Sequence, residues 1–291
     1  MEDMEDTGDV QLDAQETPEI TEVEQIELQL LMEGIYRLQG FDFKNYSLPF
    51  LRRRIQHRMN AEKLPTISAL QEKVLHDPLM MERLLNDFSV NVTEMFRDPS
   101  FFQAFRQRVV PILRDYPYIR IWHAGCSTGE EVYSMAILLH EEGLYHKARL
   151  YATDMSERSL KRAESGQFPL QRMQLYTKNY LQAGGTKAFS EYYSAIHETV
   201  EFHPFLRENL VFAQHNLVTD RSFNEFHVIV CRNVMIYFDK SLQNRVHRLF
   251  YDSLSSGGIL ALGSREGLAL TTLASRYEEV DGLEKLFRKI K

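Results

Sequence analysis

The feature that most constrains this fold is an alternation of short apolar runs and helical segments that begins after Tyr118. Because apolar runs of about four to eight residues are typical of buried parallel strands, the pattern predicts an α/β domain with a mostly parallel sheet. We expect strands at 119–124, 148–154, 210–216, 226–231 and 259–262, and helices at 129–141, 156–165 and 241–254. The Asp281-Gly282 pair, between β-like runs at 277–280 and 285–290, predicts a terminal antiparallel hairpin.

The region before this alternation has the period of helices. Leu51, Ile55 and Met59 recur at every fourth position and form one apolar stripe. Further helices are predicted to start at 65–68 and at Asp77-Pro78, since proline suits a first helical turn. We therefore predict a small all-helical domain over residues 23–95, a linker at 96–118 and the sheet domain at 119–291.

Charge is distributed unevenly along the chain, whose formal net charge is −7. Residues 1–27 contain 11 Asp and Glu residues and no Lys or Arg, which leaves 30 acidic and 34 basic residues, a net charge of +4, in the remainder. A like-charged stretch without aromatic residues cannot bury enough surface to order itself. We therefore predict an acidic disordered tail over residues 1–22, which could compete with an acidic partner for a basic face of the folded part.

Composition also excludes several classes of protein. No apolar run approaches the roughly 20 residues that span a bilayer, and the acidic N-terminus is unlike a secretory signal. Two cysteines, Cys126 and Cys231, are too few for a disulfide framework or a zinc site. A pI of about 5.8 and the lack of a basic patch interleaved with aromatic residues argue against nucleic-acid binding. We expect a cytoplasmic monomer without a metal.

Polar residues follow the predicted strands at the edge where open α/β sheets bind ligands. The turn Gly-Cys-Ser-Thr-Gly at 125–129 joins a strand to a helix, so its N–H groups and the helix dipole favour an anionic group such as a carboxylate. Asp154 ends the next strand, where an acid typically binds ribose hydroxyls. Asn216 ends the third strand; its amide could read an adenine edge while Leu217 packs on the ring.

Two further segments complete a recognisable set. Asn-Val-Thr-Glu-Met-Phe-Arg at 91–97 ends the helical region, and Cys-Arg-Asn-Val-Met-Ile-Tyr-Phe at 231–238 ends the fourth strand. In this order, the four motifs resemble the signature set of the CheR family, the S-adenosylmethionine-dependent methyltransferases of bacterial chemoreceptors. The resemblance covers roughly residue 30 to the C-terminus.

The resemblance implies a class I methyltransferase sheet with a small N-terminal helical domain and a small β-subdomain inserted at 181–206. It implies S-adenosylmethionine as the cofactor and methyl transfer to glutamate γ-carboxylates of chemoreceptor cytoplasmic helices, which yields glutamyl methyl esters and S-adenosylhomocysteine. The implied cofactor contacts are Asn91, Thr93, Arg97, Glu131, Asp154, Asn216, Leu217, Arg232 and Asn233. Arg97 and Tyr237 are implied to orient the reacting groups. Since a glutamate is already ionised at neutral pH, the reaction requires neither a general base nor a metal.

The resemblance also implies a partner and leaves alternatives open. The basic positions Arg53, Arg54, His57 and Arg58 match the family's receptor-facing helix, so we expect an acidic, helical receptor region. A CheR-like methyltransferase with another protein or a small molecule as acceptor, and an inactive cofactor-binding scaffold, are the alternatives. The turn at 125–129 also matches the Gly-x-Ser-x-Gly elbow of serine hydrolases, but one predicted strand precedes it where a hydrolase has several.

Overall fold

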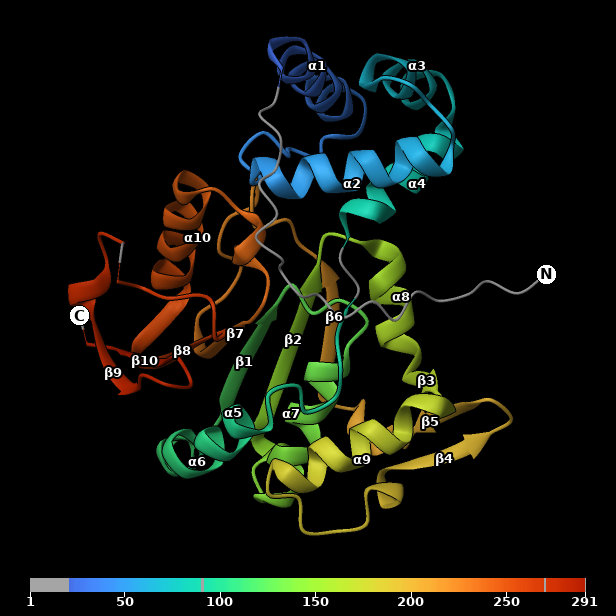
Figure 1. The fold of residues 1–291 in the computed structure, drawn as a ribbon. Coiled ribbons are helices and arrows are strands. Elements are labelled where there is room, and N and C mark those ends of the chain that lie inside the picture. The colour runs from blue at the N-terminus through green and yellow to red at the C-terminus, as the bar shows by residue number, and fades with distance from the viewer. Residues whose placement is uncertain (1–20, 90–91, 270, 291) are drawn as a thin grey trace.

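Two bodies of unequal size make up the described residues, 21–89, 92–269 and 271–290, of this computed structural model: four helices at one end, and a large sheet with its helices at the other (Figure 1). The small body contains α1 (Glu22–Gln39), α2 (Leu48–Ala61), α3 (Ile67–His76) and α4 (Pro78–Phe88). These helices pack around an apolar core of their own, which includes Leu31, Ile55 and Leu84. No helix in the described ranges is both long and apolar enough to cross a membrane.

Local signals in the sequence start these helices. Thr21 caps α1 by accepting a hydrogen bond from the Glu24 backbone (3.2 Å), and the Glu24 carboxylate accepts one from the Thr21 backbone (3.0 Å). Asp77 caps α4 by accepting a hydrogen bond from the backbone N–H of Leu79 (2.9 Å), with Pro78 in the first turn, where a missing N–H costs nothing. The helix starts predicted near residues 65–68 and 77–78 agree with the observed first residues of α3 and α4.

The large sheet has seven strands in the order β6-β2-β1-β7-β8-β10-β9. Strands β1, β2, β6, β7 and β8 are parallel, whereas β10 is antiparallel to both β8 and β9. The predicted mostly parallel sheet with a terminal antiparallel hairpin is therefore confirmed. The strands are β1 (Ile119–Ala124), β2 (Ala148–Asp154), β6 (Leu210–Gln214), β7 (Phe226–Cys231), β8 (Leu254–Leu262), β9 (Tyr277–Asp281) and β10 (Leu286–Lys289).

Helices cover both faces of this sheet, and alternate residues along each strand point to opposite layers. Ile121 packs with α7 (Glu130–Glu141), whereas the next residue, Trp122, packs with α10 (Lys240–Ser253). Helix α8 (Glu157–Ser165) follows β2. The strands are thus buried on both faces, which explains their nearly continuous apolar sequences.

The segment 96–118, predicted as a linker, is instead helical and belongs to the core of the large body. It contains α5 (Pro99–Ala104), a π-helical turn (Phe105–Val109) and α6 (Val110–Arg114). The side chains of Phe101, Phe102 and Phe105 are buried against the sheet and α7. The helical period of this region was predicted, but periodicity does not show which body a helix packs against, so its place in the core of the large body was not predicted.

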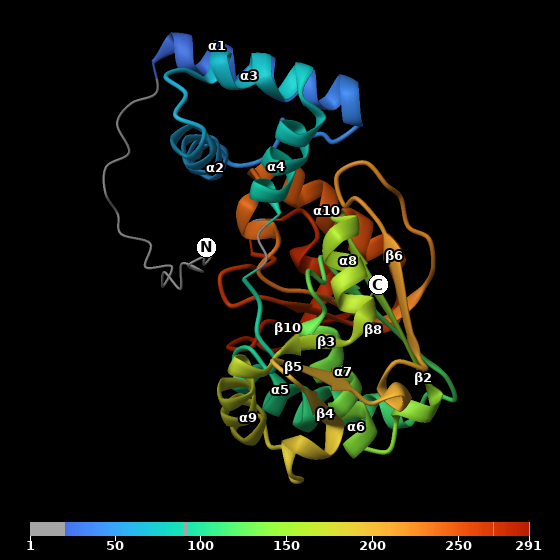
Figure 2. The ribbon, with the colours of Figure 1, turned by 90° about the vertical axis from the view of Figure 1, so that its right-hand side faces the viewer.

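A second, three-stranded antiparallel sheet of order β3-β5-β4 lies with α9 (Met173–Gln182) at the end opposite to the helical domain (Figure 2). Its strands are β3 (Gln167–Pro169), β4 (Tyr193–Ile196) and β5 (Thr199–Phe202). The subdomain therefore begins upstream of the predicted range 181–206. Strand β3 has three residues, which is too short to show an alternating pattern in the sequence.

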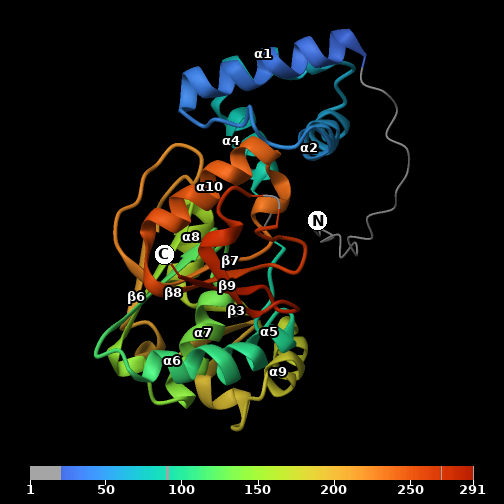
Figure 3. The same ribbon diagram turned by 90° about the vertical axis from the view of Figure 1, so that its left-hand side faces the viewer.

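The helical domain lies over the edge where the parallel strands end. Figures 1 and 3 show this arrangement from two directions. The backbones of the two bodies are joined there by hydrogen bonds from Ser47 to the carbonyl of Tyr237 (2.8 Å) and from Asp239 to the carbonyl of Asn45 (2.9 Å). An antiparallel bridge pairs Tyr46 with Phe238 between them. The fold thus places a cap over the edge at which α/β sheets bind ligands.

Candidate functional site

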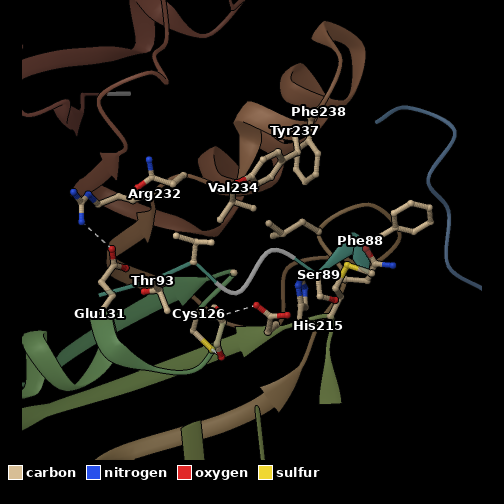
Figure 4. Close-up of a pocket in the computed structure, with 18 of the residues that line it drawn as sticks. Phe88, Ser89, Thr93, Cys126, Glu131, His215, Arg232, Val234, Tyr237 and Phe238 are labelled. Atoms are coloured by element: carbon tan, nitrogen blue, oxygen red, sulfur yellow. Dashed lines mark hydrogen bonds and ion pairs between the residues drawn. The ribbon is translucent and has the colours of Figure 1, made fainter. Parts of the chain in front are cut away.

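A pocket lies between the sheet edge and the cap, and nine of the predicted site residues line it (Figure 4). They are Thr93, Arg97, Glu131, Asp154, Asn216, Leu217, Arg232, Asn233 and Tyr237. Asn91, the tenth, lies outside the described residues. The wall also contains residues that the sequence did not single out, among them Tyr46, Phe88, Met155 and His215.

The turn at 125–129 and Asp154 form one unit at the base of the pocket. Asp154 accepts hydrogen bonds from the backbone N–H groups of Ser127 (2.8 Å) and Ser156 (2.9 Å), one on each carboxylate oxygen. Burial raises the pKa of Asp154, and these hydrogen bonds oppose that rise. A carboxylate has about four acceptor sites, so Asp154 can hold the turn and still accept a hydrogen bond from a ribose.

Gly125 brings this turn close to the loop after β7. Its φ of 77° is in the left-handed region, and a Cβ atom at this position would lie 2.6 Å from a methyl carbon of Val234. A side chain would therefore both strain the backbone and push apart two walls of the pocket.

The two glutamates at the start of α7 have different environments. Glu130 is buried toward the core, where it accepts hydrogen bonds from Thr128 (2.7 Å) and Tyr176 (3.5 Å). Glu131 lines the pocket and is bonded to Arg232 (3.0 Å) and to Nδ1 of buried His123 (3.0 Å). Burial alone would raise the pKa of Glu131, but the hydrogen bond to His123 and the charge of Arg232 hold it below its ordinary value. Glu131 thus carries a negative charge at the pocket wall, where it could pair with an ammonium group.

Arg232 joins three segments of the wall. Besides Glu131, its guanidinium binds the carboxylate of Asp98 (2.7 Å) and the carbonyl of Arg97 (3.3 Å), and it stacks 4.0 Å from the ring centroid of Phe101. Figure 4 shows the bond between Arg232 and Glu131 at one side of the pocket. Because these partners occupy its terminal nitrogens, we interpret Arg232 as a residue that positions Glu131 and the Arg97 segment.

The segment that carries Thr93 and Arg97 is fixed on the large body. The backbone N–H of Phe96 donates to the hydroxyl of Ser134 on α7 (2.8 Å), and Arg97 donates to the carbonyl of Val92 (2.9 Å). The backbone around the pocket is also strained. Of the seven non-glycine residues with positive φ in the described ranges, four lie at the pocket or in this segment: Phe96, Asp98, Ser127 and Asn233. Such strain is common where a functional geometry is imposed by its surroundings.

Tyr237 lies where the cap meets the sheet edge. Its ring packs on Phe50 of α2, with centroids 4.8 Å apart, and the neighbouring Phe238 packs edge-on against Tyr46 (5.0 Å). Burial raises the pKa of Tyr237, so its hydroxyl remains a proton donor at neutral pH. The positive charges that act on this hydroxyl in the opposite direction are those of Arg54, Arg97 and Arg53.

At the other end of the pocket, Asn216 begins a tight turn. Its side-chain oxygen accepts from the backbone of Val218 (2.9 Å), so its amide nitrogen is the group that could read an acceptor on a base. Leu217 is nearly buried beside it. His215, which the sequence analysis missed, lines the same end and packs edge-on against Trp122.

Glu266 is the most important residue of this region that the motifs did not reveal. Its buried carboxylate accepts hydrogen bonds from four backbone N–H groups at 2.7–3.0 Å: those of Asn233, Val234, Met235 and Gly263. It therefore fixes the loop after β7. A single acid 33 residues beyond Asn233 gives no signal of this role in the sequence.

One of the four basic residues predicted to face the receptor is paired within the helical domain. Arg58 does not form part of an open basic face, because its guanidinium binds both carboxylate oxygens of Asp87 (2.7 and 2.9 Å) and Glu62 (3.2 Å). Arg53 and His57 are exposed on α2, and Arg54 is half-buried. In the described ranges, His, Cys, Asp and Glu side chains form no group of three or more that could hold a metal ion.

Comparisons with known proteins agree with this geometry. The family model described as "CheR methyltransferase, SAM binding domain" matches residues 91–282, and "CheR methyltransferase, all-alpha domain" matches residues 26–89. A Pseudomonas putida protein named "Putative methyltransferase Cher3" is 48% identical over 264 residues, which cover 91% of this chain and 97% of that protein. The "Chemotaxis protein methyltransferase" of Listeria innocua is 30% identical over 229 residues, which cover 78% of this chain and 84% of that protein. The chain therefore belongs to the CheR family of S-adenosylmethionine-dependent methyltransferases.

Proposed function

We propose that this enzyme methylates glutamate γ-carboxylates on the cytoplasmic helices of chemoreceptors. The observation that carries the proposal is the positive charge of Arg53, Arg54 and Arg97 around the Tyr237 hydroxyl, where the cap meets the pocket. A cluster of cations beside a hydroxyl donor suits an anionic acceptor such as a carboxylate. The name of the Listeria innocua relative, a chemotaxis protein methyltransferase, supports the same class of substrate.

The residues of the pocket fit S-adenosylmethionine in the roles that the motifs predict. We assign Asp154 to the ribose hydroxyls, Asn216 and Leu217 to the adenine, and Glu131 to the amino group of the methionine moiety. Thr93, Arg97 and Asn233 complete the cofactor wall, and Arg232 acts through Glu131. The bound cofactor supplies an electrophilic methyl group. Tyr46 and Phe88 of the helical domain belong to the same wall, so the cap excludes water from the reacting groups.

Transfer requires that a carboxylate oxygen approach the methyl carbon in line with the sulfonium. We propose that Arg97 and Tyr237 orient this carboxylate, one by its charge and the other by its hydroxyl. A glutamate with an ordinary pKa of about 4.3 is ionised at neutral pH, so no group needs to remove a proton from it. Alignment of this kind contributes several kcal/mol to catalysis.

The direct test measures transfer of a radiolabelled methyl group from S-adenosylmethionine to receptor-bearing membranes and, separately, to a soluble metabolite extract. We expect base-labile methyl esters on the receptor and no comparable labelling of metabolites. Tyr237→Phe should lower kcat at unchanged affinity for S-adenosylhomocysteine, because the lost hydroxyl acts on the reacting groups. Tyr118→Phe is the matched control at an exposed position.

The role of the basic face is tested with the same assay. Arg53→Glu should raise KM for the receptor, whereas Arg158→Glu, on the exposed surface of α8, should leave KM unchanged. Labelling of metabolites in place of receptors would overturn the proposed substrate. Full kcat in Tyr237→Phe would show that this side chain only packs.

A further inference from the structure

A second cavity of about 360 Å³ lies between α10 and the segment 264–269 that follows β8. It shares a loop with the first pocket but no lining residue. Asn233, Val234, Tyr237 and Phe238 face the first pocket, whereas Met235 and Ile236 line the second. Its volume is within the range of about 300–1,000 Å³ that is typical of small-molecule sites.

Three cations from separate elements line this second cavity. Lys240 is at the start of α10, Arg265 is in the loop after β8, and Lys285 is in the turn between β9 and β10. In the part of the chain that the structure describes, none of the three forms an ion pair. Glu266, the acidic residue in the wall, forms no ion pair with them, and four backbone N–H groups bind its two oxygens.

A buried histidine belongs to the same wall. His247 is 2% exposed, and its Nδ1 atom is buried without a hydrogen-bond partner in the structure. Burial lowers the pKa of His247 to about 4, so the imidazole is neutral at neutral pH and Nδ1 can either donate or accept. A buried polar atom without a partner is costly, and a ligand in the cavity could satisfy it after a turn of the imidazole ring, because Nδ1 itself has almost no accessible surface here.

We propose that this cavity binds a small phosphorylated metabolite. The phosphate lies among Lys240, Arg265 and Lys285, and the organic part extends along Met235 and Ile236 toward His247. Three cations on separate elements match the charge and the several acceptor oxygens of a phosphate. The apolar side chains of Met235 and Ile236 in the wall suit an organic body better than a free ion. The site is distinct from the first pocket, because the two share no lining residue.

The test uses the full-length enzyme saturated with S-adenosylhomocysteine, which prevents the probes from entering the cofactor pocket. Calorimetric titrations compare uridine monophosphate, ribose 5-phosphate, inorganic phosphate and uridine. We expect at least one of the two organic phosphates to bind more tightly than inorganic phosphate and uridine. Lys240→Gln and Arg265→Gln should each weaken that binding about tenfold, as expected for loss of a charge-assisted hydrogen bond. Arg245→Gln, which removes the same charge from an exposed position of α10 outside the cavity, should not.

Several results would overturn the proposal. Absence of binding by both organic phosphates up to millimolar concentration would remove the site. Equal binding of uridine and uridine monophosphate would show that the cations do not recognise the phosphate. Equal binding of inorganic phosphate would contradict an organic ligand, and an equal loss in Arg245→Gln would reduce the effect to overall charge.

Discussion

Asp154 illustrates how one side chain can serve both the architecture and the ligand. It holds the turn at 125–129 through Ser127 and is also our candidate for the ribose hydroxyls. We expect Asp154→Asn to weaken S-adenosylhomocysteine binding about tenfold to a hundredfold, because a hydrogen bond to a charged group contributes about 1.5–3 kcal/mol. Calorimetric titration measures this change. Glu157→Gln, an exposed position of α8, serves as the control, and unchanged affinity in a folded Asp154→Asn would refute the assignment.

The charge of Glu131 should make the stability of the folded state depend on pH. Although burial favours its neutral form, His123 and Arg232 depress its pKa below the ordinary value of 4.5. A carboxyl group with a depressed pKa stabilises the folded state above its unfolded-state pKa, and this stabilisation is lost as the pH falls through the folded-state pKa. At pH 7 we expect Glu131→Gln to lower the free energy of unfolding by about 3 kcal/mol, since it leaves buried Arg232 with one partner fewer.

The difference between wild type and Glu131→Gln should shrink as the pH falls below 4.5. Urea titrations at a series of pH values measure it. Glu278→Gln, on an exposed position of β9, should match the wild type throughout. A difference that stays constant from pH 7 to pH 3 would mean that Glu131 contributes through packing and not through its charge.

At the scale of elements, the loop after β7 depends on Glu266. Glutamine at this position has one acceptor oxygen, so Glu266→Gln leaves some of the four backbone N–H groups without a partner. We expect a loss of about 2 kcal/mol or more in unfolding free energy, together with weaker S-adenosylhomocysteine binding because Asn233 and Val234 shift. Denaturant titration and calorimetry measure the two effects. Glu164→Gln on α8 is the control, and intact affinity in Glu266→Gln would show that the loop holds its shape without this carboxylate.

Some helices and strands could be predicted from the sequence and others could not. Strands β1, β2 and β7 are nearly continuous apolar runs, and the residues after them lie together because parallel strands end at one edge. The helical period before residue 115 was predicted, but the packing of 99–114 into the core of the large body was missed, because periodicity does not show which body a helix packs against. Strand β3 was missed because it is too short. Glu266 and the pairing of Arg58 with Asp87 depend on contacts between distant segments, which periodicity cannot show.

At the scale of the whole molecule, the boundary of the acidic tail can now be drawn more narrowly. Glu27 lies within α1, where its carboxylate binds the backbone (3.1 Å) and the hydroxyl (2.6 Å) of Ser68. We therefore expect deletion of residues 1–20 to leave the melting temperature and S-adenosylhomocysteine affinity unchanged. Deletion of residues 1–27 should lower the melting temperature, because it removes the capping box and the bonds to Ser68.

Calorimetric melting of the two truncations tests this boundary. If the tail competes for the basic face, the shorter deletion should also speed receptor methylation more at low salt than at high salt. A lower melting temperature after deletion of residues 1–20 would show that these residues contribute to the fold.

The pocket wall shared by the two bodies has a kinetic consequence. Tyr46 and Phe88 of the cap face the same space as Asp154 and Asn216 of the sheet, and aromatic contacts at Tyr237 and Phe238 hold the cap in place. In the function that we propose, the spent cofactor occupies that space after transfer, and we expect its departure to require the cap to move away from the sheet edge. The contacts that shelter the reaction would then also slow each new cycle, and turnover would depend on how readily two aromatic pairs separate.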